Sequence, residues 1–295
     1  MKKQLRGSAY LLLATIFWGS TFVAQDAAMN YIQPFTFQAV RTLVGALCLL
    51  PVIYMMDRKD GRSFTKGWMD PKLWKAGVLC GIPLFLAGNL QQLGIGEGTD
   101  PGKAGFLTTM YILFVPLIGI FRKEKAPKLL PISLVLAVAG LYFLSFSGMA
   151  RISSGDLLLL SCAFAYAVQI IVVDNYVNSV DAVRLNAIQI LVASLLTWVL
   201  MLTIDKPTVS AIGSCWLPIL YAGILSSAVA FTLQIVGQKD LPPSLASLIM
   251  SLESVFAVLT GLLFGDTMRT EEIIGCFLMF TAVILCQLPN PKKKK

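Results

Sequence analysis

Uncharged apolar segments of about the length needed to cross a membrane recur along the whole chain. A helix rises 1.5 Å per residue, so roughly 20 residues span the ~30 Å hydrocarbon core of a bilayer. Seven windows carry no charge: 7–25, 76–96, 104–121, 129–150, 157–173, 185–204 and 273–291. Three more are longer or interrupted: 27–56 with Arg41, 207–238 with a loop expected before Trp216, and 241–265 with Glu253. The sequence predicts an all-α integral membrane protein of ten transmembrane helices.

The composition argues against soluble and nucleic-acid-binding classes. Of 295 residues, 56% are hydrophobic and only 14% are charged, and the mean hydropathy of +0.75 is too high for a water-soluble domain. The net charge of +8 comes from basic residues at the termini and in short loops, without a basic face interleaved with aromatic residues. We therefore expect no nucleic-acid partner, and we expect the lipid bilayer to surround the chain.

Residues that carry catalytic or metal chemistry are scarce in this sequence. There is no histidine, and the six cysteines lie far apart with no CxxC spacing, which is typical of buried small hydrophobic residues. The apolar windows contain no paired aspartates, HExxH sequence or Ser-His dyad, and there is no P-loop. We expect neither an enzyme nor a cofactor nor a metal site.

The distribution of Lys and Arg predicts the orientation. If the N-terminus is cytoplasmic, nineteen of these residues fall in the inside segments, including Lys2, the 57–75 segment and the Lys292–Lys295 tail. Only Lys103, Arg151, Lys206 and Arg269 fall in outside loops. This bias follows the positive-inside rule. It predicts a multi-pass protein of the cell (plasma) membrane with both termini in the cytoplasm.

Two halves of the sequence resemble each other. A shift of 148 residues places Gly7 on Gly155, Trp18 on Tyr166, Thr21 on Gln169, Gln38 on Asn186 and Arg41 on Gln189. A shift of 142 residues places Gln92 on Gln234, Pro101 on Pro243, Ala104 on Ala246, Phe114 on Phe256, Gly119 on Gly261 and Glu124 on Asp266. Because each half would hold five spans, the halves enter the membrane in opposite directions, which is typical of secondary transporters. We predict one five-helix repeat at 1–150 and an inverted one at 151–295 with a basic cytoplasmic tail.

Several short motifs resemble the EamA family of the drug/metabolite transporter superfamily. They are Trp18-Gly19-Ser20, the stretch from Leu90-Gln91-Gln92 to Ala104-Gly105-Phe106, and the segment from Ala246 to Glu253. The chain departs from the family pattern at Ser254, where proline usually follows the glutamate. The resemblance implies ten helices, with spans one to four of each half around a central cavity and the fifth span peripheral. It also implies export of amino acids or other small metabolites, while distant relatives carry nucleotide-sugars or triose phosphates.

Polar and aromatic residues recur on one stripe of eight of the predicted helices, as expected for the lining of a cavity. The alternative is that they only form hydrogen bonds between helices, worth roughly 0.6 kcal/mol each. The candidate substrate-binding residues are Trp18, Thr21, Gln38, Arg41, Asn89, Gln92, Thr108, Tyr111, Tyr166, Gln169, Asn186, Gln189, Gln234 and Glu253.

Arg41 and Glu253 are the ionisable residues deepest in the predicted spans. An arginine at a helix centre costs roughly 2.5–3.5 kcal/mol, so it is usually retained for a function or a partner. One reading is a structural ion pair between the two. In the other, Arg41 binds a substrate carboxylate bidentately, and Glu253 binds an ammonium or a coupling proton.

The sequence thus predicts a secondary transporter, first of all an exporter of amino acids or related zwitterions, that works by alternating access between inverted repeats. Two alternatives stay open: a carrier of drugs or nucleotide-sugar-like anions, and a membrane binding protein that does not transport. The substrate, the coupling ion, the direction and the oligomeric state are left open.

Overall fold

The chain is helical throughout the part that the computed structural model describes, which is residues 2–99, 101–123, 127–145, 153–263 and 268–288, and no β-strand occurs in these ranges. The helices are α1 (Lys2–Met29), α2 (Pro34–Lys59), α3 (Pro71–Gly96), α4 (Pro101–Thr109), α5 (Tyr111–Phe121), α6 (Leu130–Ser145), α7 (Ser154–Tyr176), α8 (Ala182–Leu200), α9 (Val209–Ser214), α10 (Trp216–Tyr221), α11 (Phe231–Gln238), α12 (Pro243–Met250), α13 (Glu253–Leu263) and α14 (Thr270–Gln287). A 3₁₀ turn, η1 (Lys66–Trp68), precedes α3, and two π-helical stretches, η2 (Met201–Asp205) and η3 (Ala222–Ala230), follow α8 and α10.

Nine helical segments within the described ranges are long and apolar enough to cross a membrane. The predicted span 129–150 corresponds to α6, whose apolar part, Leu130–Leu144, is shorter. Its remaining residues from 146 onward lie outside the described ranges, so the count of ten stays a prediction. The same holds for the boundary between residues 150 and 151 and for the tail at Lys292–Lys295, which fall outside the described residues. A short helix, α9, occupies part of the loop expected before Trp216.

The helix boundaries follow local sequence signals. Pro34, Pro101 and Pro243 each begin a helix, where proline is favoured because the first helical N–H has no partner in the helix. Ser153 and Asp156 form a capping box at the start of α7, and such a pair satisfies two backbone donors that the helix leaves free. These signals fix where the chain turns between spans.

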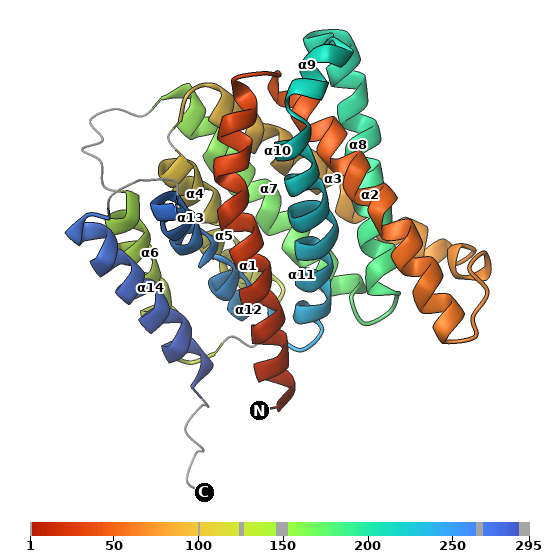
Figure 1. Cartoon of the computed structure of the whole chain (residues 1–295). Helices are drawn as coiled ribbons and strands as arrows, with labels where there is room; N and C mark the ends of the chain where they lie inside the picture. Colours follow the sequence, from red (N-terminus) through yellow and green to blue (C-terminus); the bar gives the residue numbers. More distant parts are fainter. Residues whose placement is uncertain (1, 100, 124–126, 146–152, 264–267, 289–295) are drawn as a thin grey trace, which may run out of the picture.

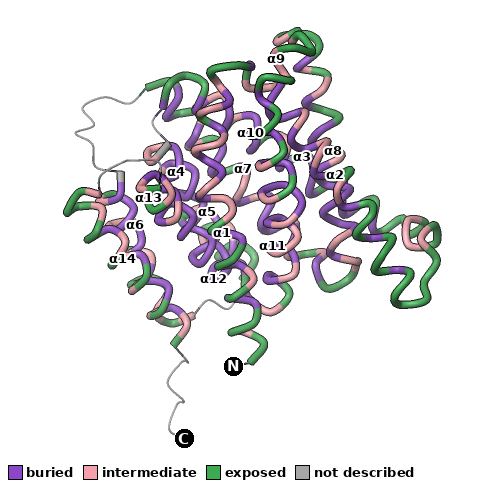
Figure 2. The backbone as a smooth tube through the Cα atoms, viewed as in Figure 1, coloured by how far each residue is buried: buried purple, intermediate pink, exposed green. Residues whose placement is uncertain are grey.

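The bundle buries polar side chains and exposes apolar ones. Gln92, Gln189 and Asn186 are completely buried, whereas Phe277 is 72% exposed and Val199 61% exposed. Figure 2 shows the buried segments on the inner sides of the helices and the exposed ones around the outside. Lipid solvates exposed apolar side chains, and polar groups inside a bilayer need internal partners. The pattern therefore fits a bundle surrounded by lipid.

Helices of the two predicted halves pack against each other. α3 lies against α7 and α8, α2 lies against α8 and η3, and α1 lies against α11 and α13. At one edge of the bundle α6 and α14 form a separate pair (Figure 1). α1 begins and α14 ends at the end of the bundle opposite α9 (Figure 1). We call these the termini end and the α9 end.

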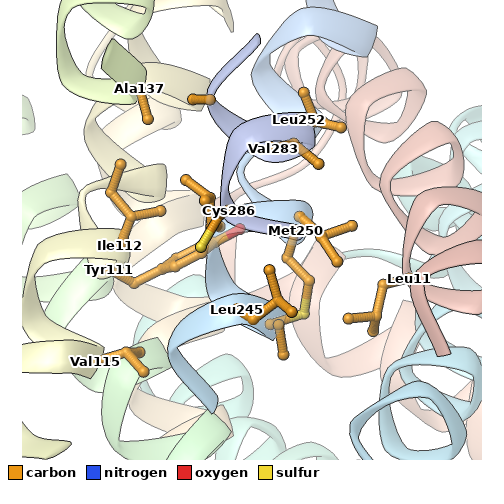
Figure 3. Packing of buried hydrophobic residues seen from close by; sticks show 14 of the residues in the cluster. Leu11, Tyr111, Ile112, Val115, Ala137, Leu245, Met250, Leu252, Val283 and Cys286 are labelled. Atoms are coloured by element: carbon orange, nitrogen blue, oxygen red, sulfur yellow. The ribbon is translucent and has the colours of Figure 1, made fainter. Parts of the chain in front are cut away.

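Two of the spans are interrupted in the middle. The first breaks at Met110 between α4 and α5, and the second breaks at Ser251 and Leu252 between α12 and α13. Met110 and Leu252 are equivalent under the shift of 142 residues, so the two breaks match. Although Ser254 replaces the proline of the family pattern, the helix is still interrupted. Figure 3 shows that Leu11, Tyr111, Met250 and Val283 converge beside these breaks from α1, α5, α12 and α14.

Similar contacts link the predicted halves at opposite ends of the bundle. Arg6 of α1 donates to Asp240, just after α11, with its Nε 2.9 Å from Oδ2. Ser154, which is 148 residues after Arg6, bonds Glu97 just after α3 at the α9 end. Lys103 and Asp156 add an ion pair of 2.6 Å there. Polar contacts therefore hold the halves together at both ends.

Candidate functional site

A small polar cavity lies among helices of both predicted halves. Its volume is about 40 Å³, which admits a few water molecules at most. Seven of the fourteen candidate residues line it: Trp18, Arg41, Tyr111, Tyr166, Gln169, Gln234 and Glu253. The rest of the lining is Gln25, Gln91, Ile170, Ser226, Phe231 and Met250. α6 and α14 contribute no residue to the lining.

Arg41 enters the cavity from the middle of α2 and is 4% exposed. Its Nε donates to Gln38 Oε1 at 2.6 Å, and its guanidinium carbon lies 5.5 Å from the centre of the Phe37 ring. Among the described residues, no acidic side chain forms an ion pair with Arg41, and its terminal nitrogens have no hydrogen-bond partner. The planar end of the guanidinium is therefore available for an anion in the cavity.

Gln38 does not line the cavity but fixes the position of Arg41. Its Oε1 accepts the bond from Arg41, and its amide packs against Gly88 of α3. A Cβ atom on Gly88 would overlap Gln38 Nε2, so only glycine leaves room for this side chain at its present position. The site therefore requires a glycine on α3 as well as the polar residues on α2.

Glu253 is the first residue of α13 and is 5% exposed. Its Oε1 accepts a hydrogen bond of 3.2 Å from the hydroxyl of Tyr111, the first residue of α5. Tyr111 and Glu253 are equivalent under the shift of 142 residues, so equivalent positions of the two interrupted spans bond to each other. Glu253 forms no ion pair with Arg41 or with any other cation in the described ranges. In this structure the two charges therefore have only neutral partners, and the expected ion pair is not formed.

A cluster of glutamines extends from the cavity toward the α9 end. Gln25 Nε2 donates to Gln91 Oε1 at 3.1 Å and to Gln92 Oε1 at 2.9 Å. Gln91 Nε2 in turn lies 3.3 Å from Thr108 Oγ1. Gln92 and Thr108 therefore support Gln25 and Gln91 from behind.

A second cluster extends toward the termini end. Gln234 Nε2 donates to Gln169 Oε1 and to Gln238 Oε1, both at 3.0 Å. Gln169 Nε2 donates to Gln189 Oε1 at 3.1 Å, and Gln189 Nε2 donates to Asn186 Oδ1 at 3.0 Å. Gln189 and Asn186 thus lie behind the lining residues Gln169 and Gln234.

The remaining candidates bond to other helical groups. Thr21 Oγ1 donates to the Phe17 carbonyl at 2.6 Å, and Asn89 Nδ2 donates to Thr197 Oγ1 at 2.8 Å. Neither residue lines the cavity. Two lining atoms are buried without a hydrogen-bond partner, Trp18 Nε1 and Gln234 Oε1, so a donor and an acceptor remain for a bound molecule or for water.

Several lining residues were not among the candidates. Gln25 follows Thr21 by one turn, and Gln91 precedes Gln92, so the polar stripe itself was the signal for both. Ser226 lies in the π-helix η3, a kind of distortion that is common at functional sites, and Phe231 packs edge-on against Trp18 at 5.1 Å between ring centres. No sequence pattern marks these two. No cluster of three metal-ligating side chains occurs among the described residues.

These features define a polytopic membrane protein with an internal polar cavity between its two halves. The model of the EamA-like transporter family matches residues 5–146 and again residues 153–287. The chain belongs to this family. The two matches cover nearly the whole chain, which agrees with two repeats.

Curated relatives carry transporter names. An "Uncharacterized transporter" of Archaeoglobus fulgidus is 30% identical over 97% of this chain and 87% of its own length. "Uncharacterized transporter YwfM" of Bacillus subtilis is 25% identical over 98% of this chain and 95% of its own length. A solved crystal structure superposes with a TM-score of 0.77 over 95% of this chain and 96% of its own, at 18% identity. That likeness shows the shared helical fold alone.

Proposed function

We propose that the protein is a secondary transporter that exports amino acids or related small zwitterions. The observation that carries the proposal is a buried arginine facing the cavity, whose terminal nitrogens have no protein partner in the described ranges. A buried charge without a counter-ion is expensive and is usually retained for a function. A substrate carboxylate would supply the missing charge and accept two parallel hydrogen bonds from the guanidinium.

Glu253 gives the site its second charge. The carboxyl group lines the same cavity as Arg41, but its one hydrogen bond comes from the neutral Tyr111 hydroxyl. An amine of the substrate would pair with Glu253, or a coupling proton would replace it once the substrate leaves. An anion without an amine, such as a nucleotide-sugar, would leave Glu253 without a cation. This difference favours the zwitterion over the anionic alternative.

Transport requires the cavity to enlarge. A volume of about 40 Å³ does not hold an amino acid, and contacts link the two halves at both ends. In our proposal the halves rock about the cavity, so that the contacts of one end open while those of the other stay closed. The matched breaks beside Tyr111 and Glu253 are suited to this motion because interrupted helices allow their two parts to reorient.

We further propose that the protein lies in the plasma membrane with the termini end in the cytoplasm. The Lys and Arg bias supports this orientation. Of the outward positions expected from sequence, Asp100 lies outside the described residues, so Lys206 after η2 is the better probe. In a variant without native cysteines, a cysteine at Lys206 should react with an impermeant maleimide in intact cells and one at Asp60 should not. Labelling of the Asp60 site alone would reverse the orientation.

The test of function is flux in proteoliposomes. Purified protein should carry radiolabelled amino acids across the vesicle membrane, and excess unlabelled zwitterion should compete better than the corresponding amine or carboxylate alone. Overproducing cells should lose the same amino acid from the cytoplasm to the medium. Flux that only carboxylates or nucleotide-sugars inhibit would instead support the anion carrier. Absence of flux with all of these classes would refute the proposal.

A further inference from the structure

A second, wholly apolar groove lies on the outside of the bundle between α2, α3 and α8. Its volume of about 340 Å³ is several times that of the central cavity, and it shares no lining residue with that cavity. Leu47 and Leu50 of α2 face Ile188 and Leu191 of α8 across it. Leu47 is 54% exposed and Leu50 is 40% exposed, so the groove is open to the surrounding lipid.

Aromatic residues form the wall of this groove at the termini end. Phe64 and Trp68, in the segment between α2 and α3, and Trp74 of α3 line it. Trp74 Nε1 donates to the Trp68 carbonyl at 2.7 Å, and the Phe64 and Trp68 rings pack edge-on at 6.0 Å between centres. Tryptophan is favoured at the level of lipid headgroups. The wall is therefore preformed, at the depth where a headgroup meets its acyl chains.

A buried ion pair ties this wall to α8. Arg184 of α8 pairs with Asp57 at the end of α2, and both residues are at most 5% exposed. The guanidinium carbon of Arg184 lies 5.6 Å from the centre of the Trp68 ring. The segment between α2 and α3 is thus anchored to α8 on one side of the groove.

The rim beside this wall has an excess of positive charge. Each of the three acidic residues from 57 to 75 is engaged: Asp57 with Arg184, Asp60 with Arg62, and Asp70 with the backbone N–H of Lys72. Five basic side chains of the same segment are exposed and form no ion pair with a described residue: Arg58, Lys59, Lys66, Lys72 and Lys75. An unpaired basic rim above an apolar groove complements a lipid with a negative headgroup.

We propose that this groove is a binding site for an anionic phospholipid. One acyl chain lies between α2 and α8 against Leu50 and Ile188, and the phosphate group lies on the rim near Lys66 and Lys72. Because α2 and α8 belong to different halves of the molecule, the lipid would contact both halves at their interface.

Another apolar hollow separates this proposal from general lipid solvation. It measures about 530 Å³, lies between α5 and α6, and is lined by residues such as Leu113 and Val135. Neither α5 nor α6 contains a charged residue. Acyl chains of any lipid would fill this hollow, with no preference for a headgroup. It is therefore the matched control.

Native mass spectrometry of delipidated protein tests the proposal. Dioleoyl phosphatidylglycerol and dioleoyl phosphatidylcholine are titrated separately, and the bound lipid is counted. The anionic lipid should bind more tightly by roughly fivefold for each basic side chain that the headgroup reaches. Leu50→Trp, which fills the groove from a lipid-facing position, should remove the tightly bound phosphatidylglycerol, whereas Val135→Trp should not.

The double substitution Lys66→Gln and Lys72→Gln tests the rim without filling the groove. Both side chains are exposed, so the fold should be unaffected, and the preference for phosphatidylglycerol should fall by about tenfold or more. Equal binding of both lipids to the wild-type protein would overturn the proposal. So would retention of the preference in the lysine variant, or equal effects of Leu50→Trp and Val135→Trp.

Discussion

The two halves use the same local geometry at α2 and α8 but give it different charges. In the first half, Arg41 donates to Gln38 three residues earlier, and in the second, Gln189 donates to Asn186 at the equivalent positions. Gln189 is neutral and also accepts from Gln169, so its polar groups are used within the protein. Arg41 keeps a charged end without a protein partner in the described ranges. Duplication thus supplied the frame, and the difference between the halves places one charge at the cavity.

The largest effect should come from changing the first half at Arg41. Arg41→Lys keeps the charge but removes the planar group that can hold a carboxylate with two bonds. Each charged hydrogen bond contributes roughly 1.5–3 kcal/mol, so we expect flux in proteoliposomes to fall about ten- to hundredfold. The melting temperature should change little.

Gln189→Ala is the matched substitution in the second half. It deprives Asn186 and Gln169 of a partner, so it should lower stability by roughly 1–3 kcal/mol while reducing flux less than Arg41→Lys does. If both variants lost flux to the same extent at equal stability, the proposed difference between the halves would be wrong.

A smaller loss should follow Gly88→Ala. The new methyl group would overlap the present position of Gln38 Nε2, so it would displace Gln38 and release Arg41 from its fixed orientation. We expect a loss of flux of roughly tenfold, because misplacing a binding group weakens the transport step without removing it. Gly213→Ala is the control, since a Cβ there meets no atom within 4 Å. Wild-type flux in Gly88→Ala would show that Gln38 does not position Arg41.

The smallest effects should separate the equivalent residues Gln92 and Gln234. Gln234 lines the cavity and has a buried oxygen without a partner, whereas Gln92 lies behind the lining. Gln234→Leu should therefore raise the substrate concentration for half-maximal flux by a few fold. Gln92→Leu should mainly lower stability, by roughly 0.6 kcal/mol for each interhelical bond lost. Competition assays and thermal melts of both variants make the comparison. The opposite assignment of the two effects would contradict the mapping of the site.

Much of the fold could be predicted because apolar length and proline position are local signals. The windows around the spans and the starts at Pro34 and Pro243 needed no tertiary information. The interruptions at Met110 and Leu252 could not be predicted in this way, since neither break contains proline or glycine. They depend on packing between spans, such as the bond between Tyr111 and Glu253.

The site could be predicted only as a set of polar stripes. Helical periodicity identifies which residues face inward, but it does not say which polar atoms use each other as partners. Thus Gln38 and Arg41 belong to one stripe, yet Gln38 supports and Arg41 lines the cavity. Trp18 and Tyr166, which are equivalent under the repeat, both reach the cavity. The division between lining and support is set by side-chain contacts across helices of both halves.

The central claim is that Arg41 and Glu253 act on the substrate and not on each other. The most direct measurement compares Arg41→Gln, Glu253→Gln and the double variant for melting temperature in detergent and for flux in liposomes. Because neither charge has an ionic partner in the described ranges, each single variant should melt at or above the wild-type temperature and carry little flux. The double variant should recover no flux. If the two charges instead formed an ion pair, each single variant would lose roughly 3–5 kcal/mol of stability. Restoration of both stability and flux in the double variant would then contradict the account.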